Sequence, residues 1–198
     1  IGLSGGVDSS TVAYLVKELG LRPLAFHFDN GWNTELSMKN IENIVRKLNI
    51  DFRTFVVNWE EFKDLQLSFI RAGVPNIEIP TDHAIVALMY KLARENNIEY
   101  IIHGGNIKTE AIMPFAWGYN ARDLKHLKEI HKRFGTKKLE TFPTLSLWKW
   151  AYYYVTKKIK KFPVLDYINY DKQKSKEYLK NNLDWKEYGS KHEESLFT

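Results

Sequence analysis

A glycine-rich turn near the start of the chain constrains the fold more than any other feature of the sequence. Residues 4–10 read Ser-Gly-Gly-Val-Asp-Ser-Ser and lie between the apolar run 1–3 and a stretch with apolar residues at helical spacing. Adjacent glycines let the backbone approach a ligand closely, and the following helix directs its unpaired N–H groups and positive dipole end at the turn. The serine hydroxyls add hydrogen-bond donors. The sequence therefore predicts a strand, a turn that cradles a polyphosphate, and a helix.

Two common nucleotide-binding loops do not fit this turn. The kinase-type loop needs a lysine, and none lies between Ile1 and Val16; the dinucleotide fingerprint needs separated glycines, which here are adjacent. An ordinary strand–helix turn is the alternative. Asp8 would repel an anion unless a cation lay between them, so we expect it to be a Mg²⁺ ligand. The residues expected to bind the phosphates are Ser4, Gly5, Gly6, Val7, Asp8, Ser9 and Ser10.

Length and composition bound the class of protein. The chain has 198 residues, 44% of them hydrophobic, enough for a core, and it contains no cysteine. Disulfides, thiolate metal sites and cysteine nucleophiles are therefore excluded for this chain. No apolar run approaches the roughly 18 residues of a membrane span, and no signal peptide is recognisable, so we expect a cytoplasmic protein. Only three residues precede the turn, where a central strand has about five or six, so we expect a fragment of a longer protein.

The positive charge is concentrated in one stretch. The formal net charge is +5, but residues 122–161 alone carry +9, leaving −4 for the remainder. Such a patch suits nucleic acid, an acidic membrane surface or a phosphorylated substrate. A solvated helical face is the alternative.

Strand and helix patterns alternate through the first half of the chain. The expected strands are 23–28, 52–57 and 100–103, and the expected helices are 35–48, 59–70 and 81–96. Parallel strands joined by single helices predict an α/β fold with a doubly wound parallel sheet. After Gly105 we expect only helices, at 121–134, 145–160 and 171–183. We therefore divide the chain into a nucleotide-binding domain, residues 1–120, and a helical substrate or lid region, residues 121–198.

Three polar turns are expected to meet at one edge of this sheet. Ligands of open parallel sheets bind beyond the carboxyl ends of the strands. The turns are residues 4–10, 27–32 and 103–106. The expected contacts to adenine and ribose are the backbone at His27, Phe28 and Asp29 and the glycines Gly104 and Gly105. These turns together predict an ATP site. The alternative for His27 and His103 is a packed or hydrogen-bonded residue, which a histidine at a strand end is more often than a catalyst.

Two residues beyond the last turn extend the predicted site. Glu110 is the best second Mg²⁺ ligand beside Asp8, and Thr109 can donate to a phosphate. The alternative for Glu110 is an acid favoured by a helix dipole.

The motif S-G-G-x-D-S-[ST] resembles the PP-loop of ATP pyrophosphatases, which cleave ATP between the α and β phosphates. The stretch from Gly105 to Glu110 is similar to the second signature of ammonia-using PP-loop ligases such as NAD synthetase and GMP synthetase. This resemblance implies the adenine nucleotide alpha hydrolase-like fold for the domain that carries the loop.

Further strings resemble the N-acetyl sugar amidotransferases of lipopolysaccharide and O-antigen biosynthesis. They span residues 27–33, 58–61, 69–76, 79–84, 117–119, 124–135 and 188–195, in order along nearly the whole chain. Two departures exist. The family carries a cysteine-containing segment that would precede Ile1, and its Gly-Gly-Lys-His-Tyr-Glu-Ser string is Gly-Ser-Lys-His-Glu-Glu-Ser at 189–195.

This resemblance implies an AMP-forming ligase. An acetamido oxygen of a nucleotide-linked sugar attacks the α-phosphorus of ATP, pyrophosphate leaves, and ammonia then displaces AMP to form an acetamidino group. The loop N–H groups, a Mg²⁺ ion held by Asp8 and Glu110, and the side chain of Lys191 would together supply positive charge. Arg133 is equally a candidate for a plain surface charge. The residues expected to form the sugar pocket are Arg71, Trp117, Tyr119, Arg122, His126, Lys132, Arg133 and His192.

A chain without cysteine has no glutaminase nucleophile. The ammonia is therefore either free in solution or, as the resemblance implies, delivered by a separate glutaminase subunit. Two other functions remain open: a tRNA-modifying PP-loop enzyme that uses residues 122–161, and a non-catalytic ATP-binding domain. The aromatic residues at 148–154 follow helical spacing and are expected in the core, so we do not expect nucleic acid as the partner.

Overall fold

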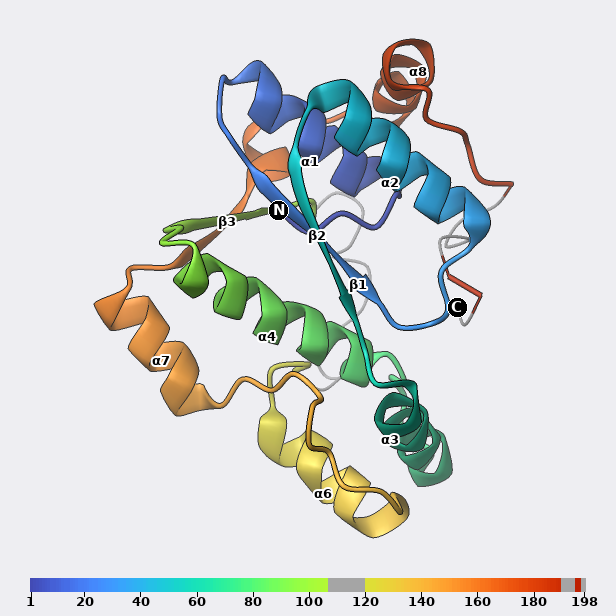
Figure 1. Ribbon diagram of the computed structural model, residues 1–198, viewed down its shortest axis with the longest axis vertical. Coiled ribbons are helices and arrows are strands. Elements are labelled where there is room, and N and C mark those ends of the chain that lie inside the picture. The colour runs from blue at the N-terminus through green and yellow to red at the C-terminus, as the bar shows by residue number, and fades with distance from the viewer. Residues whose placement is uncertain (107–119, 190–194, 197–198) are drawn as a thin grey trace. The chain divides into compact units, whose positions relative to one another are not determined.

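The computed structural model describes residues 1–106, 120–189 and 195–196 (Figure 1). Its contacts separate two compact units. The first unit contains Ile1–Phe55, Ile102–Glu110 and Lys161–Thr198, and the second contains Val56–Ile101 and Ala111–Lys160. The units thus alternate along the chain. The expected division at residue 120 stays a prediction.

The first unit is built on parallel strands joined by helices. Its elements are α1 (Val7–Glu18), β1 (Leu24–Asp29), α2 (Glu35–Leu48), β2 (Asp51–Val56), a 3-10 turn η2 (Val164–Tyr167) and α8 (Lys172–Leu183). Gly2 pairs in parallel with Phe26, and β1 pairs with β2, whose arrow runs in the same direction (Figure 1). The expected α/β fold with helical crossovers is confirmed.

Helix α8 completes the core of the first unit. It packs on α1 and α2, although it lies more than 120 residues away from them in the sequence. Asp171 accepts hydrogen bonds from the N–H groups of Gln173 and Lys174 and so begins the helix. The buried cluster that results contains Leu3, Val7, Ala13, Ala25, Ile41, Ile44, Leu179, Leu183 and Trp185.

The second unit is helical. Helix α3 (Trp59–Ala72) packs against α6 (Leu124–Phe134), and α4 (Ile79–Glu95) contacts α3, α6 and α7 (Leu147–Thr156). Helix α4 begins two residues earlier than expected because Pro80 lies in its first turn, where a missing N–H costs nothing. Within residues 1–106, 120–189 and 195–196, no helix has the length and apolar character that crossing a membrane requires.

A strand after Gly105 corrects the expectation of an all-helical C-terminal part. Residues Lys160–Pro163 form β4, which pairs with β3 (Tyr100–His103), and the chain passes between the two units within these strands. Helix α7 consequently ends at Thr156 rather than at Lys160. The segment Lys-Lys-Phe-Pro has no strand pattern of its own, so the pairing with β3 determines its conformation.

The aromatic residues of α7 are a second correction. Tyr153 is buried, but Trp148 is 84% exposed and Tyr152 and Tyr154 are each 51% exposed. Only one face of α7 packs on α4, where Tyr153 stacks on Tyr90 with 6.3 Å between ring centroids. Helical spacing therefore did not place the whole aromatic stretch in the core.

Candidate functional site

The glycine-rich loop (residues 4–10) has a backbone path that only glycine permits at Gly5. Its φ is +82°, and a Cβ there would lie 2.5 Å from the carbonyl oxygen of Ser37. The Gly5 carbonyl accepts hydrogen bonds from Trp185 Nε1 at 2.8 Å and from the Tyr188 hydroxyl at 3.0 Å. The segment after α8 thus anchors the loop from the far end of the sequence.

The loop keeps its N–H donors for a ligand. Helix α1 begins after Gly6, which offers no capping side chain, and the N–H groups of Val7, Asp8 and Ser9 have no partner among the described residues. Ser9 Oγ instead holds the loop together by donating to the Gly6 carbonyl at 3.1 Å. Unpaired donors at the start of a helix form an anion site.

The three predicted serines have different surroundings. Ser4 Oγ lies 3.1 Å from Ser9 Oγ, so this pair shapes the loop. Ser10 is completely buried, and its hydroxyl has no partner among the described residues.

Asp8 lies in the first turn of α1 beside the turn that follows β3. Its carboxylate accepts a hydrogen bond from the Tyr170 hydroxyl and lies 3.7 Å from Lys172 Nζ. Burial raises the pKa of Tyr170, and the Asp8 carboxylate raises it further, so this hydroxyl stays a donor. A Cβ on Gly104 would lie 3.1 Å from the carbonyl carbon of Asp8. The structure thus brings Asp8 and Gly104 together as the sequence predicted.

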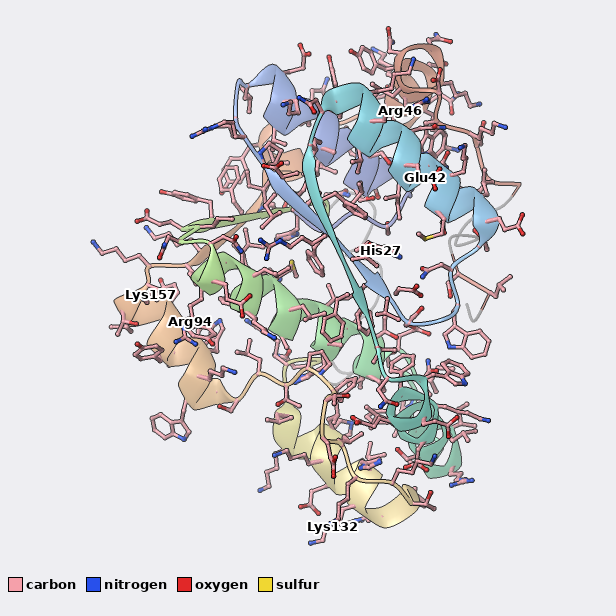
Figure 2. All side chains as sticks on the ribbon, in the orientation of Figure 1. His27, Glu42, Arg46, Arg94, Lys132 and Lys157 are labelled. Carbon is pink, nitrogen blue, oxygen red and sulfur yellow. The ribbon has the colours of Figure 1, made fainter. Side chains whose placement is uncertain are left out.

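His27 connects β1 to the segment that precedes the glycine-rich loop. Its Nδ1 lies 3.0 Å from the Leu3 carbonyl oxygen, directly before the glycine-rich loop, and Figure 2 places it midway along the β1–β2 pair. Burial lowers the pKa of His27 more than the Leu3 carbonyl and the Asp29 charge raise it. The ring is therefore neutral and positions the loop.

Asp29 shapes the turn that ends β1. One of its carboxylate oxygens accepts from the N–H of Gly31 at 3.0 Å and from Asn33 Nδ2 at 2.9 Å. Phe28 stacks on Phe55. The predicted adenine contacts of the backbone at this turn stay a prediction.

His103 belongs to the turn after β3. Its Nδ1 accepts from the N–H of Gly105 at 3.2 Å. Burial lowers the pKa of His103, and the Lys161 charge lowers it further, against a smaller opposing effect of Asp166. A neutral imidazole can accept this hydrogen bond at Nδ1, so His103 fixes the turn.

The metal site can be tested only at Asp8. Glu110, Thr109, Lys191, Trp117, Tyr119 and His192 all lie outside the described residues. In the described part of the chain, no three His, Cys, Asp or Glu side chains gather as metal ligands. Asp8 nevertheless fits Mg²⁺, which commonly binds one or two carboxylates together with phosphate oxygens and water.

The predicted sugar-binding residues that the structure describes in the second unit have different surroundings. Arg71 Nη1 donates to the Phe134 carbonyl at 3.0 Å, and the His126 ring packs edge-on against Phe69. Lys132 and Arg133 are exposed on α6, and Lys132 extends away from the helix (Figure 2). Arg122 lines a cavity of about 730 Å³ at the start of α6.

Two buried carboxylates of α3 were not predicted. Glu61 accepts from the N–H groups of residues 140–142 at 3.0–3.1 Å. Asp64 accepts from the N–H groups of Thr136 and Lys137 and from His131 Nε2 at 2.9 Å. Burial raises the pKa of Asp64, but the hydrogen bonds that it accepts together outweigh burial and lower it.

Glu61 and Asp64 fix the connection after α6 and are structural residues. Tyr170 and Lys172 were missed as well, because they lie 162 and 164 positions beyond Asp8 and belong to no recognisable motif.

Comparison with known proteins decides the family. The family model of NAD synthase matches residues 1–144. The chain belongs to the NAD synthase family. Enzymes of this family use ATP with Mg²⁺, the two ligands expected from the loop. The adenine nucleotide alpha hydrolase-like fold of the PP-loop proteins is thereby confirmed.

Three relatives illustrate the breadth of the match. An NH(3)-dependent NAD(+) synthetase from Pyrococcus horikoshii is 29% identical over 75% of this chain and 62% of its own length. A 7-cyano-7-deazaguanine synthase from Methanoculleus marisnigri is 31% identical over 52% of each chain. A probable mitochondrial tRNA-specific 2-thiouridylase from Caenorhabditis elegans is 30% identical over 52% of this chain and 32% of its own. The chain thus spans between about a third and three fifths of the length of these relatives.

Proposed function

We propose that this member of the NAD synthase family is an AMP-forming amidotransferase acting on a nucleotide-linked N-acetyl sugar in lipopolysaccharide or O-antigen biosynthesis. The observation that carries the proposal is the open glycine-rich loop with Asp8 and Gly104 against it and no lysine in the loop. That arrangement suits release of pyrophosphate. The strings from residue 27 to residue 195 supply the sugar specificity by resemblance.

The chemistry follows from what the loop holds. The acetamido oxygen attacks the α-phosphorus of ATP, the bond to the β-phosphate breaks, and pyrophosphate leaves. The N–H groups of residues 7–9 would bind this pyrophosphate as it forms. Ammonia then adds to the imidate carbon, AMP leaves, and one proton is lost. Mg²⁺, when bound, would neutralise charge on the departing pyrophosphate; Asp8 would hold it, with Glu110 as the proposed second ligand.

Lys172 is an additional cation for the same step. It lies 3.7 Å from Asp8 in the first unit, and no other carboxylate of the described residues pairs with it. Ammonia would come from a separate glutaminase subunit, since this chain contains no cysteine.

A second candidate function is modification of tRNA. The exposed Trp148, Tyr152 and Tyr154 of α7, near Lys157, offer the combination of aromatic and basic side chains that single-stranded RNA contacts. The match to a tRNA-specific thiouridylase agrees with it. The lack of cysteine opposes sulfur transfer by this chain.

A phosphorus NMR assay separates these functions. Protein, ATP and Mg²⁺ are incubated with ammonia and a nucleotide-linked acetamido sugar, or with tRNA in its place. We expect AMP and pyrophosphate that depend on the sugar and on ammonia. Turnover that needs tRNA would favour the second function, and ADP with phosphate as the main products would contradict both.

A further inference from the structure

The second unit contains a cavity that the ATP chemistry does not use. It has a volume of about 730 Å³ and is lined by residues at the start of α6 and of α7. Small-molecule sites in proteins commonly have volumes of roughly 300–1,000 Å³. The cavity therefore has room for a ligand of the size of a nucleotide.

One wall of the cavity holds an arginine in a fixed orientation. The Arg122 guanidinium lies 5.9 Å from the centroid of the Trp150 ring, and its Nε donates to Asn120 Oδ1 at 3.4 Å. Trp150 is itself held, because its Nε1 donates to the Tyr90 hydroxyl at 2.9 Å. A guanidinium stacked in this way is preorganised to donate to a phosphate.

Two lysines add to the positive charge of this wall. Lys125 and Lys128 are one turn apart on α6 and both line the cavity. Neither they nor Arg122 form an ion pair within residues 1–106, 120–189 and 195–196. Of the two carboxylates in the lining, Asp123 is committed to the start of α6, where it accepts from the N–H of His126 at 3.0 Å. The other carboxylate is that of Glu129, so the lining carries three cations against two carboxylates, a formal charge of +1.

Beside the polar residues Asn120, Glu129 and Ser146, the lining has an apolar part. Leu145 and Leu147 lie with Trp150 on the cavity surface. A bare phosphate or pyrophosphate would leave these side chains unused, whereas a purine or pyrimidine ring would cover them.

We propose that this cavity binds the nucleoside diphosphate part of the sugar substrate. The two phosphates would contact Arg122, Lys125 and Lys128, and the base would lie against the apolar wall that includes Trp150. This inference rests on the proposed function only in naming a nucleotide-linked sugar as the ligand.

Calorimetric titration without ATP tests the cavity by itself. The probes are UDP, CDP, GDP and dTDP, with the matching nucleosides and pyrophosphate as fragments. We expect one diphosphate to bind more tightly than either of its fragments. Arg122→Gln, Lys125→Gln and Lys128→Gln should each weaken it, Arg122→Gln by about tenfold or more because charge-assisted hydrogen bonds are lost.

Lys149→Gln is the matched control. Lys149 is exposed in the first turn of α7, loses the same charge on substitution, and does not line the cavity. Its titration should equal that of the unmodified protein. Saturation by none of the diphosphates, equal losses in Lys149→Gln, or unchanged binding in Arg122→Gln would each overturn the assignment.

The phosphorus NMR assay distinguishes this failure from failure of the proposed function. Sugar-dependent AMP formation whose KM for the sugar is unchanged in Arg122→Gln would refute the cavity and leave the function standing. Diphosphate binding that Arg122→Gln abolishes, in a protein that forms no AMP, would support the cavity and refute the function.

Discussion

Two loops of this protein present backbone N–H groups in opposite ways. In the second unit, the connection after α6 directs the N–H groups of residues 136, 137 and 140–142 at the carboxylates of Asp64 and Glu61. In the first unit, the N–H groups of residues 7–9 at the start of α1 meet no acceptor among the described residues. One loop is fixed by anions of the protein itself, and the other reserves its donors for an anion from outside.

The glycines near the two loops also have different neighbours. A Cβ on Gly135 would lie 2.4 Å from the His131 ring, which in turn reaches Asp64. Gly5 instead lies against the backbone of Ser37, and Gly104 against the backbone of Asp8. Close packing therefore fixes the end of α6 in the second unit and the turns around the start of α1 in the first.

The largest expected effect is loss of the internal anion at Glu61. Glu61→Ala leaves the N–H groups of residues 140–142 without their acceptor, that of Phe142 in a buried position, and we expect the free energy of unfolding to fall by about 3 kcal/mol. Urea titration followed by circular dichroism measures it. Glu60→Ala, one residue away and exposed, is the control and should leave stability unchanged; equal losses in both variants would contradict the role of Glu61.

Asp8→Asn tests the loop that is kept for an external anion. The amide retains the shape of the side chain but cannot hold Mg²⁺ as well, so turnover should fall by about 10²-fold or more, as is common when charge stabilisation is lost. The urea midpoint should stay the same. Near-normal pyrophosphate release by this variant would place the metal elsewhere.

The pH dependence of stability should reveal Asp64. Because its pKa is lowered in the folded protein, its stabilising contribution is complete above the ordinary aspartate pKa of about 3.9 and is lost as the pH falls below it. Thermal unfolding between pH 7 and pH 2.5 should show the stability difference between the unmodified protein and Asp64→Asn shrinking with acid. A constant difference over that range would exclude this linkage.

The smallest effect is expected at Lys137. Its N–H donates to Asp64, but its side chain only pairs with Glu60 at the surface. Surface ion pairs contribute little, so Lys137→Gln should have the urea midpoint of the unmodified protein. A clear loss of stability would mean that the side chain, and not the backbone donor, holds this connection.

The sequence predicted those parts of the molecule whose chemistry is local. Residues 4–10 identified the loop, and the helices at 35–48, 59–70 and 171–183 lie within one or two residues of α2, α3 and α8. Strand β4 was missed because it depends on pairing with β3. The exposure of Trp148 was missed because spacing defines a helix face but not what covers it.

The contacts that hold the candidate site in place could not be predicted, because they also join distant parts of the sequence. The Gly5 carbonyl is held by Trp185 and Tyr188, and Asp8 by Tyr170, across more than 160 residues in each case. No local pattern encodes such contacts. The structural role of Glu61 and Asp64 likewise depends on hydrogen bonds from a connection more than 70 residues further along the chain.

The anchoring of Gly5 by residues 185 and 188 also has a consequence for folding during synthesis. The second unit lies wholly between residues 56 and 160, so its segments are available to fold before α8 has been translated. The glycine-rich loop is translated before the second unit, but its anchors Trp185 and Tyr188 follow α8. We therefore expect the loop to reach its final conformation only after the second unit has been synthesised.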